Sequence, residues 1–380
     1  MIYLDNNATT RVDPLVFGAM RPYLEELWGN PSSGYRFGRE VAAGVKRARG
    51  QVAGLLGARE DEVIFTACGT ESIHTAIWSA LQAGAGRRHL VTTAVEHSAV
   101  VKVCAGYASR GYELSVVPVD GEGLVDLGEV ERVLRPDTAL VSMIWGNNET
   151  GVLGPVQGVA ELCRDRGIPL HVDAVQVAGK RKIDVGELQA DFLSLSGHKF
   201  RAPKGVGCLY VRRGTAFHPW VVGGGQESGR RGGTENVAGV VGLGAAAELA
   251  VERLGEYGDR VRGYRDALEG ELCNTLPGVR VNGSVEHRLS NTSNLSFEGV
   301  DGEALMLLLD GMGVCVSTGS ACSTGSIRPS RVLTAMGRSA GEARGTIRFS
   351  WGWDNSGSEV GEVASAVRGA VERLRGELRL

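Results

Sequence analysis

Short apolar runs alternate with segments of helical periodicity over most of the chain. Runs of four to eight residues bounded by turn residues are typical of strands that are buried on both faces. Such runs occur at 62–68, 89–95, 114–119, 138–145, 168–175, 191–197 and 206–213. Helical patterns occur at 13–28, 36–56, 70–81, 97–109, 156–166 and 237–275. Strands that alternate with helices predict an α/β fold, in which helices cover a mostly parallel sheet.

The pattern changes after the long helical segment that ends near residue 275. Short strand-like and helical segments are mixed there, at 291–297, 301–313, 345–353 and about 358–378. This mixture predicts a second, smaller α+β domain. We expect a large domain of residues 13–250 and a small domain of residues 1–12 and 251–380. We place a mobile loop that carries a cysteine at about 315–330.

Composition narrows the class of protein. The chain has 380 residues, 43% of them hydrophobic, and a formal charge of −3 from 41 basic and 44 acidic residues. No basic block favours nucleic acid, and no apolar run reaches the roughly 18–20 residues of a membrane span. The first residues, MIYLDNNATT, lack the pattern of a signal peptide. We therefore expect a cytoplasmic protein without nucleic-acid or membrane partners.

The cysteines do not form a metal or disulfide pattern. There are 7 of them, without a CxxC pair, and the histidines lack HxxxH spacing, so no metal site is expected. Cys322 lies in STGSACSTGS, among glycines and hydroxyl side chains that favour an exposed turn. Cys315 lies between two valines, which predicts a small buried residue. On this stretch alone, Cys322 is equally compatible with an incidental thiol in a linker.

Three stretches that follow predicted strands carry candidate chemistry, because ligands of open α/β sheets bind at the carboxyl ends of strands. In ACGTES, Gly69 and Thr70 open a helix whose N–H groups can hold an anion. In HVDAVQ, Asp173 ends an apolar strand and needs a cationic partner. In SLSGHKFRAPKG, Lys199 follows a strand directly, where an amine can lose its proton. Each stretch also has a structural explanation: a capped helix, a salt bridge and a surface lysine.

The three features together match one cofactor. Pyridoxal phosphate needs a lysine for its aldehyde, an acid for its pyridine nitrogen and an anion site for its phosphate. Lys204 is the alternative lysine, but it lies between proline and glycine in a predicted turn.

Ten short motifs, taken in their order along the chain, resemble those of one protein family. YLDNNATTRVDP, GNPSS, CGTES, VEHSAV, GNNETG, HVDAVQ, SGHKFRAPKGVG, RRGGTEN, GSACSTGS and GTIRFS follow one another from residue 3 to about 350. This series is similar to the signature stretches of the NifS/IscS-type cysteine desulfurases. These are class V aminotransferase-like enzymes of fold type I. The resemblance implies the fold of a fold-type I pyridoxal-phosphate-dependent transferase and a homodimer.

The resemblance also implies roles for single residues. Lys199 would bind the cofactor aldehyde, Asp173 the pyridine N–H and Gln176 the ring hydroxyl, while His97 would lie on the ring face. The implied phosphate contacts are Gly69, Thr70, Ser196, His198 and, from the other subunit, Thr234. The substrate carboxylate would be bound by Arg348 with Asn148 beside it. Cys322 would accept the sulfur of L-cysteine as a persulfide and release L-alanine.

The implied product is sulfur for iron–sulfur cluster assembly, passed to an acceptor such as a scaffold protein. The sequence leaves open which acceptor is used and whether cysteine is preferred to selenocysteine. Two alternatives remain at this point. One is a selenocysteine lyase or another class V enzyme, and the other is a non-catalytic scaffold with the same fold.

Overall fold

The computed structural model describes residues 1–318 and 329–377. Its largest sheet has seven strands in the order β2-β8-β7-β6-β5-β3-β4. All neighbouring pairs are parallel except those of β8, which is antiparallel to β2 and β7. The strands are β2 (Val63–Thr66), β3 (His89–Thr93), β4 (Glu113–Val117), β5 (Thr138–Ile144), β6 (Leu170–Asp173), β7 (Phe192–Ser196) and β8 (Gly207–Val211).

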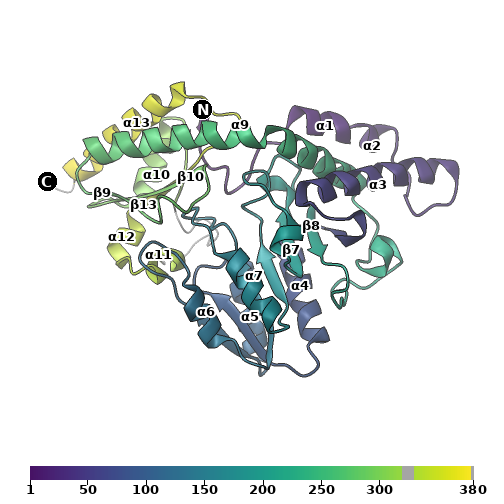
Figure 1. Ribbon diagram of the computed structural model, residues 1–380. Coiled ribbons are helices and arrows are strands. Elements are labelled where there is room, and N and C mark those ends of the chain that lie inside the picture. Colours follow the sequence, from purple (N-terminus) through teal and green to yellow (C-terminus); the bar gives the residue numbers. More distant parts are fainter. Residues whose placement is uncertain (319–328, 378–380) are drawn as a thin grey trace.

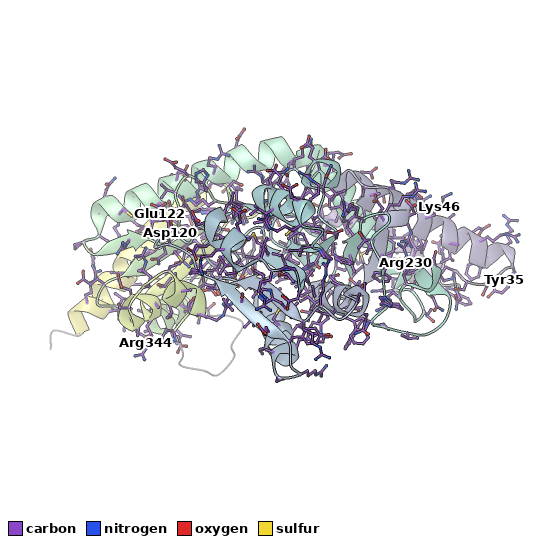
Figure 2. All side chains as sticks on the ribbon, turned by 60° about the horizontal axis from the view of Figure 1, so that its bottom comes forward. Tyr35, Lys46, Asp120, Glu122, Arg230 and Arg344 are labelled. Carbon is purple, nitrogen blue, oxygen red and sulfur yellow. The ribbon has the colours of Figure 1, made fainter. Side chains whose placement is uncertain are left out.

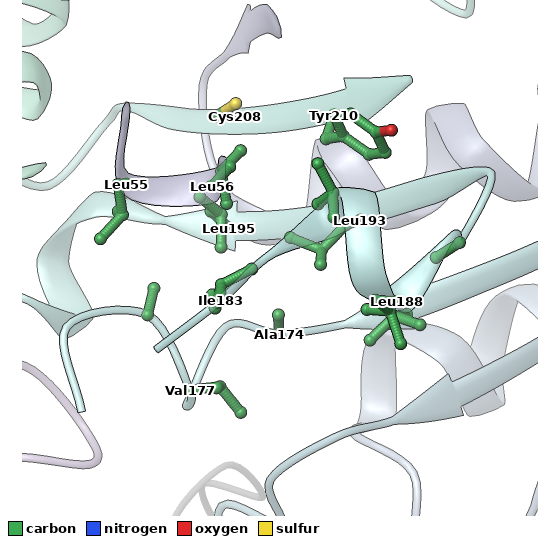
Figure 3. Close-up of a cluster of buried hydrophobic side chains, with 14 of the residues drawn as sticks. Leu55, Leu56, Ala174, Val177, Ile183, Leu188, Leu193, Leu195, Cys208 and Tyr210 are labelled. Carbon is green, nitrogen blue, oxygen red and sulfur yellow. The ribbon is translucent and has the colours of Figure 1, made fainter. Parts of the chain in front are cut away.

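Helices cover both faces of this sheet because successive strand side chains alternate between two apolar layers. On β7, Leu193 and Leu195 pack into the larger core, whereas Phe192 packs on the opposite face. Figure 3 shows Leu193 and Leu195 beside Cys208 and Tyr210 of β8, with side chains of α3 near them. The covering helices include α3 (Arg36–Leu56), α4 (Gly69–Ala83), α5 (Ser98–Ala108), α6 (Leu127–Val133), α7 (Val156–Asp165) and α8 (Val185–Leu188).

A second core lies around a four-stranded antiparallel sheet with the order β12-β13-β10-β9. Its helices are α10 (Gly302–Gly311) and α13 (Ser358–Glu377), and two short helices, α11 (Arg331–Ala335) and α12 (Ala340–Arg344), lie nearby. The N-terminus joins this part, because β1 (Ile2–Tyr3) pairs in parallel with β11 (Val314–Cys315). The strands are β9 (Val279–Val281), β10 (Thr292–Phe297), β12 (Ser317–Thr318) and β13 (Thr346–Ser350).

Helix α9 (Val237–Thr275) connects the two cores. Its first half contributes Val240 and Leu243 to the large core, and its second half contributes Leu268 and Leu272 to the other. Figure 1 shows α9 running beside α3 at one end and beside α13 at the other. A domain boundary near residue 250 stays a prediction.

Two local expectations were wrong. The segment 13–28 is not one helix: α1 (Pro14–Met20) ends before Pro22, and α2 (Pro22–Glu25) starts there, because proline fits only the first turn of a helix. Cys315 is half-buried rather than buried. Its neighbours Val314 and Val316 point into the core, and strand alternation turns Cys315 the other way.

Figure 2 shows Tyr35 at the start of α3 at one extremity and Arg344 near the opposite one. No helix within residues 1–318 and 329–377 is long and apolar enough to cross a membrane.

Candidate active site

The candidate residues gather at one edge of the large sheet. Parallel strands β6 and β7 are in register, with Asp173 opposite Ser194, and both chains leave the sheet on the same side. Asp173 is the last residue of β6 and Gln176 follows it, while His198 and Lys199 follow β7. The parallel arrangement therefore brings residues that are distant in sequence to one place.

Lys199 ends a short 3₁₀ turn, Gly197–Lys199, and is half-buried. Its Nζ donates to the main-chain oxygens of Asn7 (2.7 Å) and Ala8 (2.8 Å). The N-terminal segment thus runs past the amine and holds it. The charge of Lys199 acts to lower the pKa of Asp173, His97 and His198.

Asp173 is 2% exposed. Its Oδ1 accepts a hydrogen bond from the Val175 N–H (3.0 Å). Burial raises the pKa of its carboxyl to about 6, although the Val175 N–H and the charge of Lys199 act in the opposite direction. A nearby cation that forms a direct hydrogen bond would therefore stabilise the ionised form.

His97 caps helix α5 through its ring. Its Nδ1 accepts from the Ala99 N–H at 3.1 Å. Burial, together with the charges of Lys199 and Arg331, lowers the pKa of His97 to about 4. The imidazole is therefore neutral near pH 7, and since Nδ1 is an acceptor, its single proton is on Nε2.

The N-terminus of α4 lies against the end of β7. A Cβ added to Gly69 would stand 3.3 Å from the Ser196 Cβ and 2.9 Å from Cγ2 of Val175, so only glycine allows this approach. No side chain caps the helix at Cys68, and Thr70 is exposed. The first-turn N–H groups and the positive end of the helix dipole therefore favour an anion here.

Ser196 lies against the start of α4, and His198 lies two residues further along the chain. Ser196 is buried, and Nδ1 of His198 is 3.1 Å from Oγ1 of Thr9. Burial, and then the charges of Lys199 and Lys204, lower the pKa of His198 to about 4. His198 is therefore neutral near pH 7 and can contribute one N–H.

Arg348 lies on β13 and reaches toward this edge from the second core. Its Nη1 donates to the main-chain oxygen of Asn148 (2.8 Å), and its Nη2 pairs with Oδ1 of Asp5 (2.7 Å). Its side chain is 4% exposed, and its Nε is buried without a hydrogen-bond partner. Arg348 and Asn148 are therefore in contact, as the sequence suggested, but Asp5 was not expected.

For two predicted residues, the described part of the chain shows no contact with the candidate residues at the sheet edge. Thr234 is exposed in the glycine-rich segment 221–236. Cys322 lies outside the described residues. Both assignments stay predictions from the sequence.

Sequence reasoning missed Asn7 and Lys180, which connect the predicted residues. Asn7 is 1% exposed, and its Nδ2 donates to Thr292 Oγ1 (2.8 Å) and the Asn148 oxygen (3.3 Å). Asn7 lies in a quoted motif, so it could have been considered. Lys180 lies in VAGKRK, beside other basic residues, where nothing in the sequence indicates burial.

No group of three or more histidine, cysteine, aspartate or glutamate side chains among residues 1–318 and 329–377 is arranged to hold a metal ion.

Comparison with known proteins identifies the family of the chain. Residues 2–363 match the family described as aminotransferase class-V. The chain is 49% identical to cysteine desulfurase 2 of Trichormus variabilis over 375 residues, which cover 99% of this chain and 94% of the relative.

Two solved structures are similar over most of their length. A NifS-like protein superposes with a TM-score of 0.92 at 38% identity and covers 98% of this chain and 99% of its own. SspA in complex with cysteine superposes with a TM-score of 0.81 at 34% identity, covering 92% and 98%. The chain therefore belongs to the aminotransferase class-V family and, within it, to the NifS-like cysteine desulfurases.

Proposed function

We propose that the protein converts L-cysteine to L-alanine with pyridoxal 5'-phosphate as cofactor and receives the sulfur on Cys322 as a persulfide. The observation that supports this proposal is that Asp173 at the end of β6, His97 after β3, and His198 and Lys199 after β7 all lie at the carboxyl ends of parallel strands. The solved relative SspA in complex with cysteine supports the substrate.

The residues at this edge fit the parts of the cofactor. The uncapped start of α4, with Thr70, Ser196 and His198, provides donors for a phosphate. The buried carboxyl of Asp173 suits a protonated pyridine nitrogen, which would balance its charge. Gln176 is 3% exposed, and the amide N–H that does not donate to Asn7 can donate to the ring hydroxyl.

When bound, pyridoxal phosphate supplies an electron sink that weakens the Cα–H and Cβ–S bonds of cysteine. Lys199 would hold the cofactor aldehyde and, once released from it, would move a proton between Cα and Cβ of the substrate. His97 donates from Nε2, since its Nδ1 is engaged with the Ala99 N–H. Arg348 orients the substrate through the carboxylate, which two parallel guanidinium donors can hold.

Cys322 completes the reaction as the nucleophile. Its thiolate attacks the sulfur of cysteine, an S–S bond forms as the Cβ–S bond breaks, and the electron pair of that bond is left on the carbon that becomes the alanine methyl group. We propose that the persulfide then passes to an acceptor such as an iron–sulfur scaffold protein. We also propose a cytoplasmic homodimer in which Thr234 contacts the phosphate site of the other subunit.

The test is alanine formation by Cys322→Ser in the presence of L-cysteine and excess dithiothreitol. We expect normal cofactor content and almost no alanine, because serine cannot accept sulfur. Cys315→Ser is the matched control and should keep most of its turnover, since Cys315 is half-buried in a strand. Normal turnover by Cys322→Ser would overturn the assignment.

Two alternatives give different results in the same assay. A selenocysteine lyase would release alanine much faster from selenocysteine than from cysteine, and a non-catalytic scaffold would release none. Reduction with borohydride followed by peptide mapping distinguishes Lys199 from Lys204 as the cofactor lysine. A cofactor mass on Lys204 would contradict the proposed site.

A further inference from the structure

A buried lysine that the proposed reaction does not use lies next to Gln176. Lys180 is 7% exposed, and its Nζ donates to Oε1 of Gln176 (2.7 Å) and to Oδ1 of Asn7 (3.0 Å). Both partners are uncharged. Lys180 follows Gln176 by one helical turn in sequence, which explains how it reaches back to this side chain.

An ammonium group in this position is costly. Burial lowers the pKa of Lys180 well below its usual range, and the charges of Lys199 and Arg348 lower it further. A methionine would fill similar space without this cost. The free-energy cost of burying this lysine indicates that its hydrogen bonds serve the site rather than the stability of the fold.

The contacts determine which way the Gln176 amide faces. The Lys180 nitrogen donates to Gln176, so the atom of Gln176 that meets it is the amide oxygen. The amide nitrogen then faces the main-chain oxygen of Asn7, at 2.9 Å. One N–H of Gln176 is used there, and the other is left to donate elsewhere.

The same ammonium group fixes Asn7. Oδ1 of Asn7 accepts from Lys180 and from Nδ2 of Asn291 (3.0 Å), so its own Nδ2 must point toward Thr292 and the Asn148 oxygen. The main-chain oxygen of Asn7 accepts from both Gln176 and Lys199. Lys180 therefore belongs to a hydrogen-bonded group in which Asn7 contacts both Lys199, the predicted cofactor lysine, and the main chain of Asn148, which lies beside Arg348.

We propose that Lys180 is a positioning residue that holds the Gln176 amide with its second N–H directed at the phenolic oxygen of the pyridoxal ring. This inference rests on the proposed function. Without Lys180, the amide oxygen loses its donor and only the hydrogen bond to the Asn7 main-chain oxygen holds the amide in this orientation. Lys180 itself does not touch the cofactor or the substrate in this proposal.

A double-mutant cycle tests the proposal. Lys180→Met, Gln176→Ala and the double variant are dialysed free of cofactor and titrated with pyridoxal 5'-phosphate, and the pH midpoint of the visible absorption band is recorded. We expect each single change to weaken binding about tenfold, as for one charge-assisted hydrogen bond, and to move the midpoint. The double variant should resemble the singles, because both remove one interaction.

The matched control is Lys182→Met. Lys182 is two residues away with its side chain 72% exposed, so this change should leave affinity and spectrum unaltered. Unchanged affinity and band in Lys180→Met would overturn the proposal, and so would additive losses in the double variant. If the unchanged protein binds no pyridoxal phosphate, the proposed function fails and this inference fails with it.

A second measurement does not require Lys180→Met to fold. Gln176→Glu places a carboxylate next to Lys180 while removing the amide donor. We expect the cofactor-free Gln176→Glu protein to melt at a higher temperature than Gln176→Ala, since the buried cation gains a counter-charge, while cofactor affinity falls. A lower melting temperature than Gln176→Ala would contradict the contact.

Discussion

Arg348 is a buried cation that the N-terminal segment holds in place. Asp5 balances its charge at 2.7 Å, and the Asn148 oxygen takes a second donor. The guanidinium has a further donor, Nε, without a partner. A planar group with several donors can hold these neighbours and a substrate carboxylate together, which an ammonium cannot do in the same geometry.

We therefore expect Arg348→Lys to raise the KM for cysteine about tenfold or more. This is the loss expected when one of the two parallel hydrogen bonds of a bidentate pair is removed. Cofactor content should stay near normal, because Arg348 is not assigned to the cofactor. Steady-state kinetics, with absorbance as a measure of bound cofactor, checks both points. Wild-type kinetics in this variant would refute the role.

At the scale of secondary structure, two histidines bridge neighbouring strands of the large sheet. The ring of His171 on β6 is 2.8 Å from the hydroxyls of Ser142 on β5 and Ser194 on β7. His89 on β3 contacts Thr138 and Ser115 in the same way. Each neutral ring can donate to one strand and accept from the other, which satisfies polar groups inside an apolar layer.

Burial lowers the pKa of His171 to about 3. The unfolded chain binds a proton near pH 6.5 and the folded protein does not, so His171 stabilises the fold above pH 6.5, and this stability is lost as the pH falls. Between pH 7 and pH 5 we expect a loss of about 2 kcal/mol from this residue.

Urea unfolding at pH 7 and pH 5 measures this loss. His171→Gln should reduce the pH dependence, while His218→Gln, at an exposed residue, should leave it unchanged. An equal pH dependence in His171→Gln and the unchanged protein would show that the ring of His171 is not responsible.

At the scale of the whole molecule, one end carries large apolar side chains in contact with solvent. Leu24 is 60% exposed and Trp28 is 73% exposed, and α1–α3 form this end in Figure 1. The segment that carries Thr234 is tied to the body by the ion pairs Arg49–Glu227 and Arg231–Glu71. The exposed apolar surface around Leu24 and Trp28 favours association with a second copy of the chain.

We expect light scattering to show a dimer, and Trp28→Asp to shift it toward the monomer with weaker cofactor binding. Leu307→Asp is the control, because Leu307 is also exposed, at 66%, but lies on α10 in the other half of the molecule. A fully active monomer would rule out a phosphate contact from the partner.

The sequence determined the order of the elements, because apolar periodicity and turn residues act over a few positions. It also placed Asp173 at the end of a strand and Lys199 after one, and the parallel sheet brings such positions to one edge. The family followed from ordered motifs. The roles of the site residues, including Cys322, stay predictions.

Only the tertiary structure decided the partners across long separations. The contacts of Asn7 with Lys180, Gln176 and Lys199 join positions more than 160 residues apart, and no local pattern encodes them. The half-buried side of Cys315 depends on its pairing with Tyr3 in β1. Local sequence specifies the conformation of a segment, whereas burial and charge depend on what the folded chain brings next to it.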